Sequence, residues 1–395
     1  MLYRKMPKTG DELSILGFGC MRLPQKDGRI DEERAIRQVR HAIDRGVNYI
    51  DTAWPYHAGE SEPFLASALA GGYRERVRLA TKLPAWMVKQ PADFNRFLDA
   101  QLRKLNTPRI DYYLVHSLRG ELWDRVVELG VVDFLDHALA DGRIGHAGFS
   151  YHGAREDFKH VVDAYPWTFC QIQYNYLDEE NQAGAEGLKY AASQGLGVVV
   201  MEPLRGGTLG LAPPPEIDAL WQQAETRRTP AEWALRWVWD HPEVTVALSG
   251  MNDEAQIDEN LAIAASASAG SLSTTETALV AAVAKRFRES MKAGCTGCGY
   301  CQPCPSGVDI PGCLDLLNLY HTFGKVQEAP FVYALRCAGI FTGKPSYASL
   351  CSHCQDCTIK CPQNLEIPGL LEQVTALFEG DGLREREAAV RRLFQ

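Results

Sequence analysis

Two cysteine motifs near the C-terminal end carry the densest chemistry of the sequence. Each motif places two residues between each of three successive cysteines, and a fourth cysteine follows directly before a proline. Loops with this spacing can direct three thiolates to three irons of one cubane, and in paired-cluster proteins the fourth cysteine commonly ligates the other cluster. The motifs predict eight iron ligands: Cys295, Cys298, Cys301, Cys304, Cys351, Cys354, Cys357 and Cys361.

We expect these thiolates to hold two [4Fe-4S] clusters as cofactors. One expected ligand set is Cys295, Cys298, Cys301 and Cys361. The other expected set is Cys351, Cys354, Cys357 and Cys304. The last gap is two residues in the first motif and three in the second, so the sequence leaves ligand crossover open. Zinc is the alternative, because Cys-x2-Cys pairs are normal zinc ligands, but triplets followed by Cys-Pro favour iron–sulfur clusters.

The cluster region also repeats internally. Segments 304–311 and 361–368 share Cys-Pro, an apolar residue, an acid, Ile and Pro at the same offsets. Each half is therefore expected to run from a cluster loop into a helix that starts at the proline. The 46 residues between the motifs are rich in Leu and Ala, which predicts helices, as in the α-helical ferredoxin type. Cys313 and Cys337 lie outside the motifs and are expected to be packed thiols.

Four polar side chains in the first 116 residues form a second candidate site: Asp51, Tyr56, Lys82 and His116. Reduction of a carbonyl by hydride needs a proton for the developing alkoxide, and an ordinary phenol has a pKa near 10. A buried ammonium at Lys82 would lower the pKa of Tyr56, and Asp51 would keep that ammonium charged. His116 could donate a hydrogen bond to the carbonyl oxygen. Each residue alone has an ordinary structural explanation, so the hypothesis depends on the whole set.

A regular alternation of β-rich runs and helical segments must position these residues. Eight runs are expected to be strands: 14–20, 47–52, 77–83, 110–116, 144–150, 168–174, 197–202 and 244–249. Segments such as 31–45, with one apolar face, predict covering helices. Eight such units in about 250 residues have the count and size of a closed (β/α)8 TIM barrel. An open doubly wound sheet is the alternative, but no Gly-x-Gly-x-x-Gly turn follows an early strand.

Composition changes mark the expected domain organisation of this α/β chain. Segment 262–273 is rich in Ala, Ser and Gly and is expected to be a linker. Ser273 and Glu276 then form a possible capping box for a helix that runs towards Met291. We predict three parts: a (β/α)8 barrel at 1–285, a mostly α-helical two-cluster ferredoxin-like domain at 286–372, and a C-terminal helical tail at 373–395 whose surface helix covers 383–395.

Charge and cysteine placement narrow the partners and the compartment. The net charge of −9 argues against nucleic acid or an anionic membrane surface as the main partner. No apolar run resembles a signal peptide or is long enough to span a bilayer. Ten of the twelve cysteines fall between Cys295 and Cys361, unlike the wider spread of a secreted disulfide protein. We therefore expect a soluble, cytoplasmic protein.

The second candidate site also carries a family resemblance. The stretch 46–53 reads Gly-Val-Asn-Tyr-Ile-Asp-Thr-Ala and, with the residues that follow it, resembles the signature of the aldo-keto reductase superfamily. The further matching residues are Tyr56, Gly59, Ser61, Glu62, Leu65, Thr81, Lys82, Val115 and His116. The resemblance covers roughly residues 1–262, and the whole chain is similar to the branch that carries a C-terminal ferredoxin domain. It implies the same barrel fold and the same catalytic tetrad.

The resemblance further implies a nicotinamide cofactor, NADP or NAD, across the barrel mouth. Two residues match the carboxamide-binding positions: Ser150 and Gln171. Ser249, Gly250 and Asn260 fall in the family's phosphate-binding segment, where a helix N-terminus receives phosphates. A turn after the seventh strand could contact the pyrophosphate, and it consists of Leu204, Arg205, Gly206 and Gly207.

Three positions depart from the family pattern. Tyr151 replaces the usual asparagine, and Met201 replaces the aromatic residue that stacks on nicotinamide. Gln256 stands where an arginine usually grips the 2′-phosphate of NADP. An amide cannot replace the charge or the fork geometry of that arginine, so the choice between NADP and NAD stays open.

These features predict an oxidoreductase that moves a hydride between the nicotinamide and a small-molecule carbonyl or alcohol substrate. The clusters would serve electron transfer, with a redox partner protein, or would be structural. The alternative is an electron-transfer or docking protein whose barrel is catalytically idle, and the complete tetrad argues against it. Trp54, Trp86 and Trp123 would line a substrate pocket or pack in the core.

Overall fold

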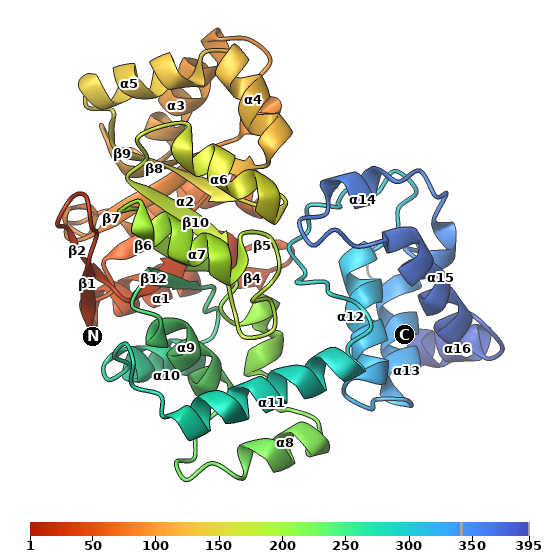
Figure 1. The fold of residues 1–395 in the computed structure, drawn as a ribbon. Coiled ribbons are helices and arrows are strands. Elements are labelled where there is room, and N and C mark those ends of the chain that lie inside the picture. Colours follow the sequence, from red (N-terminus) through yellow and green to blue (C-terminus); the bar gives the residue numbers. More distant parts are fainter. Residues whose placement is uncertain (340–342, 394–395) are drawn as a thin grey trace. The chain divides into compact units, whose positions relative to one another are not determined.

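Eight parallel strands close into a barrel in the order in which the chain provides them (Figure 1). The computed structural model describes residues 1–339 and 343–393. The barrel strands are β3 (Leu16–Gly19), β6 (Tyr49–Asp51), β7 (Arg78–Leu83), β8 (Ile110–Leu118), β9 (Ile144–Tyr151), β10 (Phe169–Gln173), β11 (Gly197–Met201) and β12 (Val244–Ser249). Each falls within or overlaps one predicted run, so the (β/α)8 prediction is confirmed and the open-sheet alternative is wrong.

Two short antiparallel hairpins lie outside the barrel ladder. They pair β1 (Tyr3–Lys5) with β2 (Glu12–Ser14), and β4 (Gln25–Lys26) with β5 (Arg29–Ile30). The predicted first strand at 14–20 is therefore too long at both ends. Ser14 belongs to β2, and Cys20 begins a short 3-10 helix.

Helices cover the outside of the barrel because each has one apolar face (Figure 1). In α1 (Glu32–Asp44) the buried residues include Ala35, Val39 and Ala42, and the Asp31 side chain caps the helix by accepting from the Arg34 N–H. This confirms the helix predicted at 31–45. The other helices of this part are α2 (Ser61–Ala68), α3 (Ala92–Lys104), α4 (Gly120–Glu128), α5 (Val131–Ala140), α6 (Arg155–Asp163), α7 (Gly184–Ser193), α9 (Pro230–Asp240) and α10 (Glu254–Ala264).

The barrel interior is a packed core, as expected for eight strands. Its buried residues come from several strands and from the β1–β2 hairpin: Met6, Leu13, Tyr49, Ala80, Tyr112, Leu114, Phe169, Val199, Val246 and Leu248. Phe169 on β10 faces Gly148 on β9 in the ladder. A Cβ atom at Gly148 would overlap the Phe169 ring. The missing side chain therefore makes the space that the ring fills.

The chain divides into two compact units. The first comprises Met1–Leu204 and Ala231–Thr277, and the second comprises Arg205–Pro230 and Ala278–Gln395. Within the second unit, α8 (Pro215–Trp221) lies beside α11 (Thr274–Ser290), and Arg286 Nη2 lies 3.4 Å from Glu216 Oε1 (Figure 1). The compact units thus divide the chain at 204, 230 and 277, whereas the predicted domain limits at 285 and 372 stay predictions.

The capping box predicted before α11 is confirmed. The Ser273 N–H donates to Glu276 Oε2 at 2.9 Å, and the Glu276 N–H donates to Ser273 Oγ at 3.2 Å. These two bonds satisfy donors that the first helical turn leaves unpaired. The predicted linker at 262–273 is only partly irregular, because α10 continues to Ala264.

The second unit is mostly helical, as predicted. Its longer helices are α12 (Ile310–His321), α13 (Glu328–Cys337), α15 (Ile367–Phe378) and α16 (Leu383–Leu393), with the short α14 (Asp356–Lys360) before α15. Both repeat halves start a helix at the predicted place, with a proline in the first turn. The acids of the repeat are the N-caps: Asp309 accepts from the Gly312 N–H and Glu366 from the Gly369 N–H.

The remaining predictions for this part of the chain concern two cysteines and the C-terminal tail. Cys313 and Cys337 are fully buried in the core of α12 and α13, so they are packed thiols. The tail contains the predicted helix, but Val390 is also fully buried, so α16 is not purely a surface helix. Residues 340–342 of the predicted ferredoxin-like domain and 394–395 of the predicted tail lie outside the described residues. Within 1–339 and 343–393, no helix has both the length and the apolar composition needed to cross a membrane.

We expect Gly148→Ala to destabilise the barrel by about 1–3 kcal/mol, because the added methyl overpacks the core against Phe169. Thermal unfolding followed by circular dichroism measures this as a lower Tm. Gly380→Ala is the control, since no atom lies within 4 Å of a Cβ built there. Equal Tm values for the Gly148 variant and the wild type would contradict the role given to this glycine.

Candidate active site and cysteine cavities

Strand register brings Lys82 and Asp51 together. Asp51 ends β6 and pairs with Ala80 of β7. Lys82 lies two residues further along β7, and residues two apart share one face of a strand. Lys82 Nζ donates to Asp51 Oδ1 at 2.6 Å, to Asp51 Oδ2 at 2.8 Å and to the Thr52 carbonyl at 2.8 Å. The ammonium is thus surrounded by three oxygen acceptors at the C-terminal ends of two strands.

Both members of this pair are buried, with 0% and 3% of the Lys82 and Asp51 side chains exposed. Burial lowers the pKa of Lys82 and raises the pKa of Asp51, and the attraction between the two charges opposes both shifts. The 2.6 and 2.8 Å contacts have the lengths of charge-assisted hydrogen bonds. We therefore treat the pair as ionised.

Tyr56 completes the contact on the other side of Lys82. Lys82 Nζ lies 3.4 Å from Tyr56 Oη and 4.9 Å from the ring centroid. Tyr56 starts a short 3-10 segment in which His57 and Ala58 have φ values of 52° and 55°. This left-handed pair of residues is uncommon without glycine, and it belongs to the loop that holds the phenol beside the ammonium.

His116 joins this group from β8. Its ring centroid lies 6.3 Å from the Tyr56 ring and 5.1 Å from the Trp86 ring. Burial, followed by the charges of Lys82 and His152, holds the pKa of His116 well below its ordinary value. The imidazole is therefore neutral at neutral pH, and a neutral imidazole has one N–H donor and one acceptor. The structure thus brings all four predicted catalytic residues together.

His152 is a member of this neighbourhood that sequence reasoning missed. It follows β9, is 8% exposed, and its Nδ1 lies 3.1 Å from Gln182 Oε1. Gln182 Nε2 donates to Gln173 Oε1 at 3.1 Å, and Gln173 Nε2 donates to Asp178 Oδ2 at 2.9 Å. Burial lowers the pKa of His152 to about 4. Its place directly after a predicted strand end was the available signal.

The three tryptophans separate into different roles. Trp123 is 1% exposed and packs on Trp167, so it belongs to the core. Trp54 packs edge-on against Phe97 and lies under Lys104 Nζ at 3.6 Å. Trp86 is 37% exposed and lies beside His116. Of the three, Trp86 is the one beside a predicted catalytic residue.

The two predicted carboxamide-binding residues are buried on adjacent strands. Ser150 Oγ accepts from the Ser117 N–H at 2.8 Å. Gln171 pairs with Ser150 in the β9–β10 ladder, and its Nε2 lies 3.7 Å from Met201 Sδ. Gln171 Oε1 is buried without a hydrogen-bond partner within the described residues. A buried acceptor that lacks a donor suits the NH2 group of a carboxamide.

The predicted phosphate-binding residues gather where β12 leads into α10. Asn260 Nδ2 donates to Ser249 Oγ at 3.1 Å, and both side chains are buried. A Cβ at Gly250 would lie 3.1 Å from Arg22 Cβ, so the backbone passes closely there. Gln256 is exposed in the first turns of α10, and its Oε1 accepts from the Asn252 N–H at 3.4 Å.

The turn after β11 carries the chain from the first unit into the second. Leu204 is the last residue of its segment in the first unit, and Arg205 and Gly206 belong to the second unit. Arg205 Nη2 donates to the Gly294 carbonyl at 3.2 Å, and Nη1 lies 3.1 Å from Met291 Sδ. The predicted pyrophosphate contact of Leu204, Arg205 and Gly206 stays a prediction, while the observed contacts of Arg205 lie next to the first cysteine motif.

The cysteines line two cavities in the second unit. The first is lined by the cysteines of one expected ligand set: Cys295, Cys298, Cys301 and Cys361. The second is lined by the other set: Cys304, Cys351, Cys354 and Cys357. Three cysteines of one motif thus meet the fourth cysteine of the other motif. The structure places them in the crossed sets expected from the sequence.

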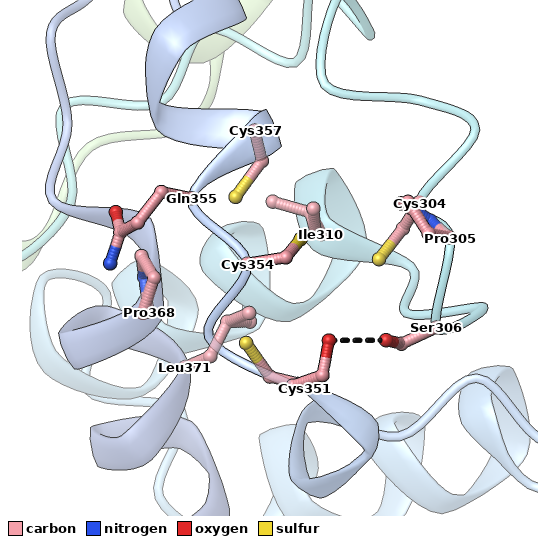
Figure 2. Close-up of a pocket in the computed structure, with 11 residues that line it drawn as sticks. Cys304, Pro305, Ser306, Ile310, Cys351, Cys354, Gln355, Cys357, Pro368 and Leu371 are labelled. Carbon is pink, nitrogen blue, oxygen red and sulfur yellow. Dashed lines mark hydrogen bonds between the residues drawn. The ribbon is translucent and has the colours of Figure 1, made fainter.

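Figure 2 shows the second cavity, where the sulfurs of Cys304, Cys351 and Cys357 point into a common space. Ser306 and Ser352 hydrogen-bond at 2.9 Å and tie the two loops together at its rim. Ile310 lines both cavities and separates them with an apolar side chain. Within 1–339 and 343–393, no three His, Cys, Asp or Glu side chains converge on a point suited to a single metal ion. The irons of a cubane lie at separate corners, so its four thiolate ligands are spread around a cavity and do not converge on one point.

Comparison with known proteins follows this division of the chain. Residues 15–282 match the model of the aldo/keto reductase family, and residues 294–365 match that of the 4Fe-4S dicluster domain. The uncharacterized oxidoreductase YrpG of Bacillus subtilis is 30% identical over 53% of this chain and 68% of its own length. The L-galactose dehydrogenase of Arabidopsis thaliana is 25% identical over 66% of this chain and 86% of its own length.

Solved structures give the same result for the barrel. The aldo-keto reductase AKR11C1 from Bacillus halodurans in its holo form matches with a TM-score of 0.60 and 26% identity. The match covers 72% of this chain and 96% of that protein. The thermostable aldo-keto reductase Tm1743 also has a TM-score of 0.60, at 23% identity, and this match supports the fold alone.

We expect His152→Gln to reduce the pH dependence of stability on the acid side. The pKa of His152 is about 4 when folded and about 6.5 when unfolded, so its unfolded state binds more protons between these values. Stability from the neutral imidazole is present above pH 6.5 and is lost as pH falls, by on the order of 3 kcal/mol in total. The Tm difference between pH 7 and pH 5 should therefore be smaller in the variant. An unchanged difference would show that His152 does not titrate in this way.

Proposed function

The chain belongs to the aldo/keto reductase family and carries a 4Fe-4S dicluster domain, and we propose that it transfers hydride between a nicotinamide and a small carbonyl or alcohol. The observation that supports this most is the position of Lys82 Nζ, 2.6 Å from Asp51 Oδ1 and 3.4 Å from Tyr56 Oη. An acid, a cation and a phenol in contact form a proton donor suited to a developing alkoxide.

Each catalytic side chain has a separate task in this proposal. The Tyr56 hydroxyl gives its proton to the carbonyl oxygen, and the Lys82 ammonium stabilises the phenolate that remains. Asp51 holds the ammonium charged and oriented. His116, which is neutral, donates an N–H to the same carbonyl oxygen and so orients the substrate. Bound nicotinamide supplies the hydride, and alcohol oxidation runs through the same groups in reverse.

The proposed cofactor contacts rest on side chains that the fold gathers along three strands. Ser150 and Gln171 would bind the carboxamide, because the buried Gln171 acceptor lacks a partner within the described residues. Ser249, Gly250 and Asn260 would bind the phosphates at the start of α10. Gln256 offers no charge to a 2′-phosphate, and the nearby Arg34 guanidinium is already paired with Asp253 and Glu254. We therefore propose that NAD binds more tightly than NADP.

We propose further that the two crossed cysteine sets bind two [4Fe-4S] clusters that exchange single electrons with a redox partner protein. A cluster moves one electron at a time, whereas hydride carries two together, so exchange between these two kinds of chemistry needs an intermediary. We also propose that the chain has three domains: the barrel at 1–285, the cluster domain at 286–372 and the tail at 373–395.

Tyr56→Phe should lower kcat/KM for carbonyl reduction by roughly 10²–10⁴-fold, since the proton donor is lost. Nicotinamide binding should stay within a few-fold of the wild type, because Tyr56 is not among the proposed cofactor contacts. Stopped-flow kinetics with a panel of aldehydes and ketones, and fluorescence titration with NADH and NADPH, measure both quantities.

Tyr113→Phe is the matched control for this experiment. Tyr113 is a buried phenol whose Oη donates to Gln101 Oε1 at 2.8 Å. It should keep kcat/KM within about threefold of the wild type. If the wild type binds neither nicotinamide, the hydride proposal is wrong and the idle-barrel alternative gains support.

Ligand crossover predicts a specific result for cysteine double variants. Cys304→Ser and Cys361→Ser should each lower iron from roughly eight to roughly four atoms per chain after anaerobic purification. Cys304→Ser with Cys351→Ser should also keep about four irons, since both ligands serve one cluster. Cys304→Ser with Cys295→Ser should keep almost none. Retention of about four irons in this last variant would contradict the crossed sets.

A further inference from the structure

The Arg205 side chain lies against the loop that carries Cys295. It is 5% exposed, its Nη2 donates to the Gly294 carbonyl at 3.2 Å, and its Nη1 lies 3.1 Å from Met291 Sδ. A guanidinium keeps its proton even when buried. A permanent positive charge is therefore held at the carbonyl of Gly294, the residue that precedes Cys295 in the sequence.

The backbone at Arg205 fixes this placement. Arg205 and Gly206 have φ values of 48° and 69°, so the chain makes a left-handed turn there. A Cβ at Gly206 would overlap the Thr296 carbonyl. The Arg205 guanidinium thus contacts Gly294, and the next residue packs against Thr296. The turn holds the backbone on both sides of Cys295.

We propose that the positive charge of Arg205 raises the reduction potential of the cluster bound by Cys295, Cys298, Cys301 and Cys361. This inference rests on the proposed function, because it requires that this cavity holds a [4Fe-4S] cluster. Reduction adds one negative charge to the cluster, and a nearby positive charge stabilises the reduced form more than the oxidised form. Water screens this interaction little, because the guanidinium is buried.

The other polar groups around Cys295 are compatible with this effect. The Gly297 N–H donates to Cys295 Sγ at 3.4 Å, and hydrogen bonds to cluster sulfurs also favour the reduced state. Asp315 on α12 is the carboxylate that acts on Cys295. Its side chain is exposed, although desolvation still raises the pKa of its carboxyl, so it opposes the influence of Arg205 from a position that water screens in part.

The test compares reduction potentials of the full-length protein, purified and reconstituted under anaerobic conditions. Electron paramagnetic resonance follows a redox titration of the wild type, Arg205→Gln and Arg205→Lys. For Arg205→Gln, we expect the equilibrium constant for reduction of one cluster to fall roughly tenfold, which is about 59 mV for one electron. The second cluster should be unchanged. Arg205→Lys keeps the charge and should stay within about threefold of the wild type.

Two controls identify the cluster and the cause. The reduction potential is also measured with and without Arg205→Gln in the Cys304→Ser background, which should keep only the cluster at Cys295. The fall in potential caused by Arg205→Gln must persist there. Arg286→Gln removes a charge from the same unit, but Arg286 pairs with Glu216 and Glu289 on the surface. This variant should leave both potentials unchanged.

An unshifted potential in a fully loaded Arg205→Gln variant would overturn the inference, as would an equal shift of both clusters. If Arg205→Gln fails to retain the cluster, Arg205→Lys decides the question. If Arg205→Lys loses the cluster, or if its equilibrium constant for reduction falls tenfold, the contacts of the guanidinium matter rather than its charge. The inference would then be wrong. A wild type without two reducible clusters would instead contradict the proposed function.

Discussion

The buried charge of Lys82 constrains the barrel mouth more than any other group. An ammonium inside a protein is tolerated only when acceptors replace its water. Asp51 supplies two of them and the Thr52 carbonyl a third. These contacts require β6 and β7 to keep their register, and they bring the cation to Tyr56. The same arrangement that satisfies the charge therefore places an ammonium beside a phenol.

The cysteine cavities impose a comparable constraint on the second unit. Each cavity needs cysteines from both motifs, which are separated by a long helical segment. Ile310, at the start of α12, lines both cavities, and the capped starts of α12 and α15 direct the loops toward them. Because the ligands come from distant parts of the chain, binding of iron and sulfide should be coupled to folding of these helices.

For Arg205, the sequence correctly indicated a turn after a barrel strand but did not indicate which part of the chain the side chain contacts. Its neighbours Gly206 and Gly207 marked a turn after a barrel strand, which suggested contact with a cofactor phosphate. That contact stays a prediction, and the structure shows that the guanidinium contacts Gly294 and Met291 in the second unit. Only the path of the folded chain shows that this turn leaves the first unit and packs beside a cysteine loop.

The eight strands and the two helices that start at the repeated prolines were predictable from the sequence, because local spacing and periodicity determine them. The cysteine motifs suggested the crossed sets but left crossover open, and only the folded chain brings three cysteines of one motif together with the fourth cysteine of the other. The tetrad could also be inferred, since parallel strands place their C-terminal ends on one face of a barrel. Three features were decided only by the tertiary structure: the burial of His152, the Gln171 Oε1 acceptor that has no partner among residues 1–339 and 343–393, and the place of Arg205. Burial, pKa and charge proximity depend on residues far apart in the chain, and no local pattern contains those distances.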